Sequence, residues 1–375
     1  MAFPADYTLL GNLEFPAVTG SHSGFVALVN YADFTSSMLA SIDDGGGDLR
    51  FSSDSAGATQ LPCEVEKLDK TSTEAFVWVR VSTAATAEKI YVWGGNTGDA
   101  QPLVTAPFGR NSVWVDYEGV FHLNDYSDSA GKMPDMVLFN GSTSPAQVDV
   151  GGDKGYDFGT NSTMLTSTLT TNIENATGLF TIQVKGLKNA IDSGTFDREP
   201  FVSVAASSGT GGYDFSLEAH QDDDPVSALR VLKPQNNSNS IGDTASDPPS
   251  INSPITASLM GDLVSNTANG YAFFNGVVLS VSGDAGDTFP VPLNLFGIGG
   301  RVDTSPSPGD VTVLDARIRY SLLSTDYLGT EFENQDSSGP YFIATDAVAT
   351  GPNTPVNPSI TNLLATSARL NWGQG

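Results

Sequence analysis

Residues 271–281 read Tyr-Ala-Phe-Phe-Asn-Gly-Val-Val-Leu-Ser-Val, and they carry the clearest structural signal in the chain. Asn275 and Gly276 separate two apolar runs that are rich in aromatic and β-branched residues, the types enriched in strands. An Asn-Gly pair in this setting favours the type I′ turn of a two-residue hairpin, because both central positions of that turn need positive φ. The stretch therefore predicts a tight antiparallel hairpin and points to an all-β fold.

Further strand patterns lie on both sides of this hairpin. They fall at residues 120–123, 179–184, 213–218, 228–232 and 311–320. Residues 324–333 differ, because Ser324 stands at an N-cap position and apolar residues follow it at helical spacing. We therefore expect one short helix near the end of an antiparallel β-sandwich.

The N-terminal part of the chain has the same character. Its strand patterns, which are apolar or alternate between apolar and polar residues, lie at 25–29, 49–51, 74–81 and 89–94. No segment up to residue 108 keeps the apolar period of 3.6 that a surface helix needs. We expect a compact antiparallel sandwich here as well.

The chain has 375 residues, enough for two or three domains at roughly 100–200 residues each. We expect an N-terminal β-sandwich at 1–108 and a second sandwich, of the jelly-roll type, at 109–346. The connection at 101–108 is apolar and bounded by proline, so we expect the two sandwiches to pack on each other. A proline-rich linker at 347–358 and the opening strands of an incomplete domain at 359–375 follow.

The charge of the chain excludes two classes of partner. With 43 acidic and 17 basic side chains, the formal net charge is −26. Such a chain repels the phosphate backbone of nucleic acids and anionic membrane surfaces, so we expect neither as a partner. The charge suits a protein in a salty or calcium-containing medium, or it serves solubility alone.

The N-terminus, residues 1–6, lacks the basic and apolar regions of a secretory signal. No apolar run reaches the 18 residues expected of a membrane-spanning helix, so we expect no membrane insertion. An extracellular type of fold without an export signal suggests either that a signal was removed or that the protein leaves the cell inside a virus particle released by lysis.

Residues that could carry catalysis are scattered along the chain. A glycoside hydrolase needs two carboxylates at a fixed separation, and the nearest pattern, at 64–69, fits the solvated face of a strand. His22, His122 and His220 have no zinc-ligand spacing, and we expect His122 to pack or to bond to backbone within its strand. Cys63, the only cysteine, is expected to be a small buried side chain. The sequence therefore predicts a protein that is not an enzyme.

Calcium is the one ion that the acidic loops suggest, because it takes six to eight hard oxygen ligands. The candidate ligands are Asp43, Asp44 and Asp48, the pair Asp125 and Asp128, and the run from Asp222 to Asp224. None of these clusters matches an EF-hand. The alternative for each is an ordinary acidic turn, so calcium is a candidate cofactor only.

The N-terminal region resembles a domain of unknown function that precedes lectin-like domains in bacterial, archaeal and phage surface proteins. The shared pattern runs through Asp48-Leu49-Arg50-Phe51, Leu61-Pro62-Cys63-Glu64-Val65-Glu66, Val77-Trp78-Val79 and Ile90-Tyr91-Val92-Trp93-Gly94-Gly95-Asn96. Cys63 stands where the family tends to carry an aromatic residue, and Trp93-Gly94 replaces a usual pair of tyrosines.

The second region resembles a concanavalin A-like, laminin-G-like jelly roll. The matching pieces are Phe121-His122-Leu123, Asp128-Ser129-Ala130-Gly131, Gly155-Tyr156-Asp157-Phe158, the Asn275-Gly276 hairpin, the strand from Asp315 to Tyr320, and the helix from Ser324 to Gln335. The final stub, from Pro358 to Trp372, is similar to the first strands of a fibronectin type III domain. These resemblances imply consecutive β-sandwiches with a surface role.

The jelly-roll resemblance also implies a mode of ligand binding. Sugar sites in such folds combine an aromatic platform with polar side chains, and the aromatic candidates in the second region are Tyr126, Tyr156 and Tyr213. The implied function is a non-enzymatic structural or display protein on the virion surface of a tailed virus, in capsid decoration or tail association. Its partners would be other virion proteins, further copies of itself in a homo-oligomer, and host or environmental glycans. The alternative is a secreted or cell-surface glycan-binding adhesin of a bacterium or archaeon.

Overall fold

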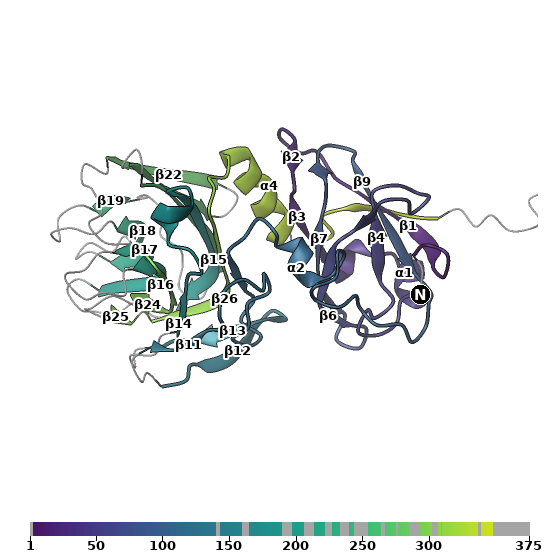
Figure 1. The fold of residues 1–375 in the computed structure, drawn as a ribbon, viewed down its shortest axis with the longest axis horizontal. Coiled ribbons are helices and arrows are strands. Elements are labelled where there is room, and N and C mark those ends of the chain that lie inside the picture. Colours follow the sequence, from purple (N-terminus) through teal and green to yellow (C-terminus); the bar gives the residue numbers. More distant parts are fainter. Residues whose placement is uncertain are drawn as a thin grey trace, which may run out of the picture.

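The structure is a computed structural model, and most of its described residues form two lobes of antiparallel sheet (Figure 1). It describes residues 3–139, 143–159, 165–189, 197–205, 214–221, 227–232, 240–243, 254–263, 267–274, 277–284, 293–301, 307–308, 310–336 and 339–347. Each lobe is a pair of stacked sheets, so the predicted all-β fold with two antiparallel β-sandwiches is confirmed.

The N-terminal lobe stacks a five-stranded sheet on a three-stranded one. The first has the order β27-β1-β9-β4-β5, formed by Ile343–Asp346, Thr8–Glu14, Lys89–Gly94, Arg50–Ser52 and Gln60–Leu61. The second has the order β3-β7-β6, formed by Val26–Asn30, Glu74–Arg80 and Cys63–Asp69. Smaller elements are β2 (His22–Ser23) paired with β8 (Thr83–Ala84), the 3-10 helix η1 (Tyr31–Asp33) and α1 (Ser36–Ser41).

Strands β3 and β7 are apolar on both faces because both faces are buried. Successive side chains of a strand point to opposite faces. Ala27 and Val29 pack into the core of the N-terminal lobe, whereas Val26 and Leu28 join Trp78 in a separate cluster on the side of the second lobe. The continuous apolar run at 25–29 is thus explained by a sheet that is covered on both faces.

The second lobe stacks two larger sheets. One has the order β12-β13-β26-β15-β20-β21-β22, with β10 also paired to β26; these strands are Ala146–Val150, Asp153–Asp157, Val311–Arg319, Leu179–Lys188, Ile255–Asp262, Thr267–Phe274, Val277–Asp284 and, for β10, Gly119–Phe121. The other has the order β11-β14-β23-β16-β17-β18-β19, formed by Val137–Leu138, Leu165–Thr168, Leu295–Ile298, Asp197–Ala205, Asp214–Gln221, Ser227–Leu232 and Ser240–Asp243. The remaining elements are α2 (Arg110–Val113), α3 (Ile173–Ala176), β24 (Gly300–Arg301) and β25 (Ser307–Pro308).

Alternation along β15 fixes which face of its sheet is apolar. Phe180, Ile182 and Val184 enter the core of the second lobe, where they lie with Phe201 and Phe296 of the opposite sheet. Each such side chain stabilises the fold by about 1.5–3 kcal/mol when fully buried. The residues between them, which include Gln183, therefore face the other way, toward the N-terminal lobe.

Two local predictions of secondary structure are confirmed. Strands β21 and β22 pair as a hairpin with Phe274 opposite Val277, and the turn residues between them lie outside the described part of the chain. The predicted short helix is α4 (Thr325–Gln335), and the side chain of Ser324 caps it by accepting the N–H of Tyr327.

The chain returns to the N-terminal lobe at its C-terminal end. Strand β27 pairs with β1, and Asn12 lies opposite Thr345. The carboxylate of Asp33 accepts the backbone N–H groups of Tyr341 at 2.6 Å and Phe342 at 2.9 Å. This return covers the edge of β1, which would otherwise present unpaired backbone groups.

The last part of the expected second domain, 109–346, packs on the N-terminal lobe. Leu323, Leu328 and Phe342 belong to the core of the N-terminal lobe, although they follow the last strand of the second one. The N-terminal sandwich is completed by residues that the chain reaches only after building the second lobe.

The last two expected segments lie almost wholly outside the described residues. Of the linker at 347–358, the structure describes Ala347, whose N–H donates to the carbonyl of Leu10 at 2.8 Å. The stub at 359–375, with its likeness to a fibronectin type III domain, stays a prediction.

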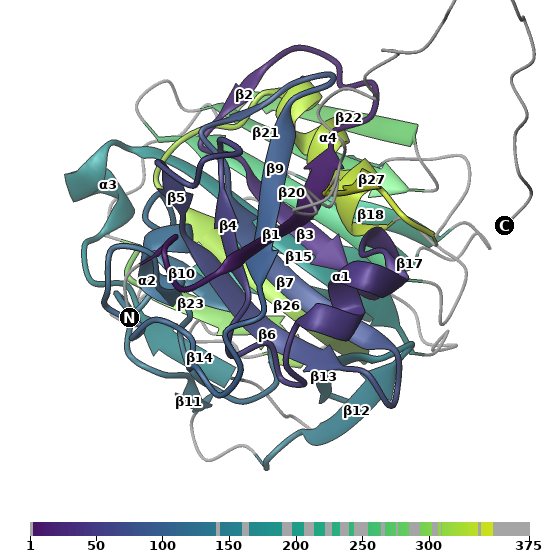
Figure 2. The ribbon, with the colours of Figure 1, turned by 90° about the vertical axis from the view of Figure 1, so that its right-hand side faces the viewer.

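Helix α4 lies between the lobes in Figure 1 and bonds to both of them. In Figure 2, where the N-terminal lobe faces the viewer, the helix is seen in the upper part of the molecule. On one side, Asn334 accepts the N–H of Leu28 at 2.7 Å and donates to its carbonyl at 2.8 Å. Because β3 is an edge strand, this amide satisfies backbone groups of Leu28 that no neighbouring strand reaches. On the other side, Glu331 accepts hydrogen bonds from Gln183 and Arg317 of the second lobe.

Replacing Asn334 by alanine tests this role. In Asn334→Ala, the buried N–H and C=O of Leu28 lose their partner, and two unsatisfied buried groups should lower the free energy of unfolding by about 2–4 kcal/mol. Chemical denaturation followed by tryptophan fluorescence measures the change.

The matched control is Glu333→Ala, because Glu333 is exposed on the same helix. We expect that variant to unfold like the wild type. Equal stabilities of the two variants would contradict the role assigned to Asn334.

Candidate functional site

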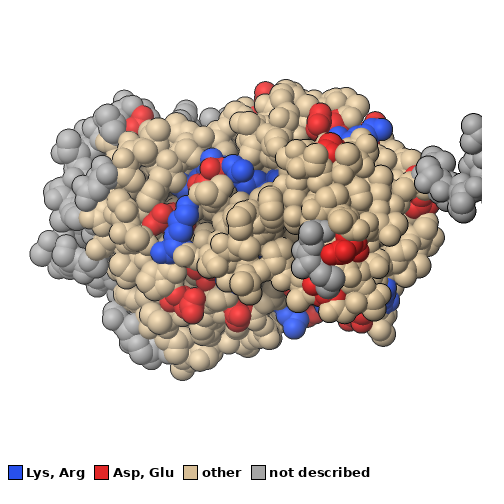
Figure 3. Space-filling model, turned by 45° about the vertical axis from the view of Figure 1, so that its right-hand side comes forward, with Lys and Arg blue, Asp and Glu red and all other residues tan. Residues whose placement is uncertain are grey.

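The two lobes meet where a sheet of each lobe faces the other, and both of these faces carry polar and aromatic side chains. Strands β6 and β7 of the N-terminal lobe face β15 and β26 of the second lobe, and α4 and the chain after α2 close the sides (Figure 1). In the space-filling view, a line of basic side chains with acidic ones beside it is visible on the surface near the middle of the molecule (Figure 3). Further charged side chains interact in the buried space between the facing strands. We call the residues that interact there the junction cluster: Glu64, Glu66, Trp78, Trp114, His122, Gln183, Asp315, Arg317 and Glu331.

Asp315 and Arg317 lie at the centre of the junction cluster. Two apart on β26, they share one face of the strand. The Nε of Arg317 lies 2.6 Å from Asp315, and its NH1 lies 3.1 Å from Glu331. The second oxygen of Asp315 contacts the Nδ1 of His122 at 2.7 Å.

The carboxylate of Glu64 accepts three hydrogen bonds from residues that follow the connection between the lobes. Ser129 donates to its Oε1 at 2.9 Å and the indole of Trp114 to its Oε2 at 2.5 Å, while the Nε2 of His122 lies 3.3 Å from that Oε2. The prediction that 64–69 is a solvated strand face is wrong for Glu64 and Glu66, whose side chains are 8% and 10% exposed. Their face of β6 is covered by the other lobe.

The expectation for His122 is half right, because its ring packs as predicted but makes its polar contacts with side chains. Its ring does not bond to backbone within its strand but contacts the carboxylates of Glu64 and Asp315. It stacks on the ring of Trp78 with centroids 5.2 Å apart and planes 9° apart. The guanidinium of Arg317 lies 4.5 Å from the centroid of Trp78, so both cations lie against one aromatic side chain.

Ion pairing fixes the charge state of the cluster. Burial alone would lower the pKa of His122, but the carboxylates of Glu66 and Glu64 and the hydrogen bond with Asp315 raise it well above its usual value. Burial alone would raise the pKa of Asp315, but Arg317 and His122 outweigh it and hold that pKa at about 2. At neutral pH the carboxylate of Asp315 is therefore ionised and lies between protonated His122 and the guanidinium of Arg317.

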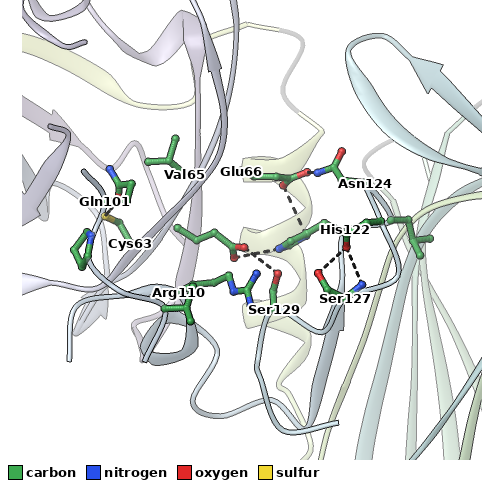
Figure 4. A pocket seen from close by; sticks show the side chains of 14 residues that line it. Cys63, Val65, Glu66, Gln101, Arg110, His122, Asn124, Ser127 and Ser129 are labelled. Carbon is green, nitrogen blue, oxygen red and sulfur yellow. Dashed lines mark hydrogen bonds and ion pairs between the residues drawn. The ribbon is translucent and has the colours of Figure 1, made fainter. Parts of the chain in front are cut away.

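A hollow of about 330 Å³ opens beside the cluster, between the two lobes (Figure 4). In the close-up, Asn124 meets Glu66, and Arg110 and Ser129 lie on the same side of the hollow. Three segments form the wall: β6, the connection from Gln101 to Arg110, and the loop that follows β10. The lining residues are Cys63, Glu64, Val65, Glu66, Gln101, Pro102, Val104, Arg110, His122, Leu123, Asn124, Asp125, Ser127 and Ser129.

Cys63 behaves as the sequence predicts. It is 2% exposed, and burial raises the pKa of its thiol to about 12. A neutral thiol is a poor nucleophile, so this residue forms a wall of the hollow and is not a reactive group.

The N-terminal calcium candidates each cap a different piece of backbone. Asp48 accepts the N–H groups of Asp43 and Gly95, both at 2.8 Å. Asp43 accepts the N–H of Gly98, and Asp44 that of Lys70. Their oxygens are directed at separate N–H groups, which does not fit a shared calcium site.

The second pair of calcium candidates is used in the same way. Asp128 accepts four backbone N–H groups, from Val120, Ala130, Lys132 and Met133. Asp125 accepts the N–H and the hydroxyl of Ser127. This geometry does not fit a calcium ion at Asp128, because its acceptor positions are already filled.

The third group of calcium candidates, residues 222–224, lies outside the described residues. Within the described part of the chain, no group of three or more His, Cys, Asp or Glu residues has an arrangement that could hold a metal ion. In the same part, no helix is long and apolar enough to cross a membrane.

Two of the three glycan candidates lie together. The rings of Tyr126 and Tyr156 have centroids 5.1 Å apart and planes tilted by 50°, and both half-buried side chains pack against the core of the second lobe. Tyr213 lies outside the described residues. Tyr126 belongs to the loop whose neighbouring residues line the hollow.

Sequence reasoning missed Asp315, Arg317 and Arg110 as site residues. A signal for the first two is present: they interrupt the apolar strand at 311–320 at alternate positions, and therefore share a face. Opposite charges on one face of a mostly apolar strand, here with Arg319 as a third charged residue, indicate a buried ion pair. Arg110 has no comparable signal, because only the folded connection brings it to β6.

Comparison with known sequences gives one partial match. A domain of unknown function (DUF2341) matches residues 45–102. This match supports the resemblance of the N-terminal region to such a domain, and it includes the strand with Glu64 and Glu66. No curated protein sequence matches the chain.

Solved structures align with the chain at low identity. Domain 4 of AbnA, an extracellular arabinanase from Geobacillus stearothermophilus in complex with arabinotriose, is 16% identical over 58% of this chain and 97% of that chain, with a TM-score of 0.42. Trypanosoma rangeli sialidase is 14% identical over 73% of this chain and 43% of its own, with a TM-score of 0.42. Tailspike protein 2 from an Escherichia coli O157:H7 bacteriophage is 13% identical over 55% of this chain and 28% of its own, with a TM-score of 0.39. The chain spans less than half of the sialidase, and likenesses this distant carry no argument about ligand or activity.

Removing the central cation tests the energetic role of the junction cluster. In Arg317→Met, the buried carboxylates of Asp315 and Glu331 lose their partner, and we expect the free energy of unfolding to fall by about 3–5 kcal/mol. The control is Lys89→Met, which breaks an ion pair with Glu14 whose side chains are 41% and 29% exposed. Exposed pairs contribute about 0–1 kcal/mol, so similar losses in the two variants would contradict a structural role for the junction.

The raised pKa of His122 predicts a pH dependence. The folded chain holds this proton more tightly than the unfolded chain, so the stabilisation is complete below the unfolded pKa and is lost as pH rises through the folded pKa. We expect stability to fall by up to about 1.4 kcal/mol per pH unit in the range above the unfolded pKa of about 6.5.

Denaturation curves across that range measure the slope. His122→Gln should flatten it, whereas His22→Gln should keep it, because His22 bonds to the hydroxyl of Thr330. A wild-type stability that does not change with pH would contradict the ion-paired state of His122.

Proposed function

We propose that this chain is a non-enzymatic, glycan-binding display protein. The observation that supports it best is the alternating chain of buried charges from Glu64 through His122, Asp315 and Arg317 to Glu331, which joins the two sandwiches. A display protein attaches to a particle or cell through one domain and presents its binding surface on another, so it needs rigid contacts between its domains. The junction provides them, and α4 and β27 tie the chain back to its own N-terminal lobe.

The same charges argue against catalysis. A general acid or base works best when its pKa lies near the operating pH and when it can reach the substrate. Asp315 has a pKa of about 2, His122 has a pKa raised well above its usual value, and Glu64 already accepts three hydrogen bonds. These groups stabilise one another, and their ion pairs and existing hydrogen bonds oppose proton transfer to a ligand.

The proposed location is the virion surface of a tailed virus, in capsid decoration or tail association, with other virion proteins or further copies of the chain as neighbours. The motivation is the resemblance to surface proteins that also occur in phage, together with the net charge of −26. Many copies on one particle would turn weak glycan binding into useful avidity. The alternative is a secreted or cell-surface adhesin of a bacterium or archaeon.

The proposal is tested with the full chain on an array of neutral and acidic oligosaccharides, followed by a reducing-end assay on every sugar that binds. We expect binding without release of new reducing ends. Hydrolysis of a bound sugar would overturn the non-enzymatic part, and binding to no sugar would overturn the glycan part.

A second measurement separates the two locations. Mass spectrometry of purified virus particles should detect the chain among the structural proteins. Its absence from particles and its presence in the culture medium or on cells would favour the adhesin.

A further inference from the structure

We propose that the hollow between the lobes is the sugar site of this protein, and that it takes a neutral mono- or disaccharide. The inference rests on the proposed glycan-binding function and deepens it, because it names the place and the chemistry of the ligand. It also moves the site away from the tyrosine pair that the sequence suggests.

The size of the hollow fits a small ligand. Its volume of about 330 Å³ lies at the lower end of the roughly 300–1,000 Å³ found for small-molecule sites. The wall comes from both lobes and from the connection between them, so the site exists only when the junction is formed. Such sites are common at domain interfaces.

The hollow offers acceptors that are only partly used. Glu66 accepts the indole N–H of Trp78 at 2.9 Å and a hydrogen bond from Asn124. An ionised carboxylate has about four acceptor positions, so roughly half of its capacity is left. Asp125 adds a second carboxylate, which bonds to Ser127 through one of its two oxygens.

The hollow also offers an unused donor. The Nε of Arg110 is buried and has no hydrogen-bond partner among the described residues. A buried polar atom without a partner costs free energy unless a ligand or water satisfies it. Arg110 lines the hollow, and the rest of its guanidinium can donate to a ligand oxygen in that space.

This combination selects hydroxyl groups. Each sugar hydroxyl donates one hydrogen bond and accepts others, so it can bridge the guanidinium of Arg110 and a carboxylate. An acidic sugar would bring a negative charge next to Glu64, Glu66 and Asp125, which like-charge repulsion disfavours. The apolar part of the wall, formed by Val65, Val104 and Leu123 among others, suits the C–H face of a sugar ring.

The walls are held in place before any ligand arrives. Asn124 is bonded to Glu66, Ser129 to Glu64, and Gln101 to the carbonyl of Leu49. Side chains that are already ordered lose little conformational entropy on binding. A ligand can therefore bind to the hollow without a preceding rearrangement of its walls.

The test uses the full chain and named probes: glucose, galactose, N-acetylglucosamine, maltose, cellobiose and lactose, with glucuronate as the acidic counterpart. Saturation-transfer NMR and calorimetry measure binding. We expect at least one neutral probe to bind more tightly than glucuronate. Arg110→Met, which keeps most of the aliphatic stem and removes the guanidinium, should weaken that binding at least tenfold.

A blocking variant makes the test independent of Arg110. Val104 lines the hollow and is 46% exposed, so Val104→Trp should fill the hollow and reduce binding at least tenfold without touching its hydrogen bonds. Val115 is 49% exposed and lies outside the lining, so Val115→Trp is the matched control and should bind like the wild type.

The outcomes separate this inference from the proposed function. Binding that survives Arg110→Met and Val104→Trp but is lost in Tyr126→Ala would overturn the hollow as the site and leave the glycan function standing. Tighter binding of glucuronate would overturn the neutral ligand. If the wild type binds no saccharide by array, NMR or calorimetry, the glycan function itself fails, and the inference fails with it.

Discussion

Burial of the Arg317 guanidinium between the two lobes is the constraint on which the rest of the structure depends. Taking a charge out of water is costly, and the cost is offset only when opposite charges and hydrogen bonds surround it closely. Here Asp315 and Glu331 supply the carboxylates, and Trp78 and Trp114 supply the aromatic faces. The lobes cannot separate without exposing this arrangement or leaving its charges unpaired, so their relative position is fixed by electrostatics as well as by apolar contact.

The order of the chain strengthens that constraint. The second lobe is built between the strands of the first, because α4 and β27 return to the N-terminal lobe after β26 is complete. Asn334 satisfies the edge of β3, and β27 covers the edge of β1. A sheet edge without a partner invites association with other chains, so the return both joins the lobes and protects the sheets. The two sandwiches are thus separate in space, but the N-terminal one is not formed by a single continuous segment of the chain.

The hollow and the junction cluster are two parts of one surface. Glu64 and Glu66 contribute to both: they hold Trp114, Trp78 and Asn124 by hydrogen bonds, and they form part of the wall of the hollow. The side chains that stabilise the interface therefore also keep the hollow open and polar. This double use explains why acidic residues on an apparently ordinary strand are buried, and it gives the interface a chemical character suited to a ligand rich in hydroxyl groups.

The sequence by itself determined the local features of this protein. The Asn275-Gly276 pair between apolar runs predicted the hairpin, Ser324 predicted the start of α4, and the alternating runs predicted the strands, because each of these depends on neighbouring residues along the chain. Only the tertiary structure decided the pairing of β27 with β1, the burial of Glu64 and the charge of His122. His122 and Asp315 are 193 residues apart, and Leu28 and Asn334 are 306 apart. No local pattern encodes such pairs, since the side chains find each other only after both lobes have formed and water has been excluded from the space between them.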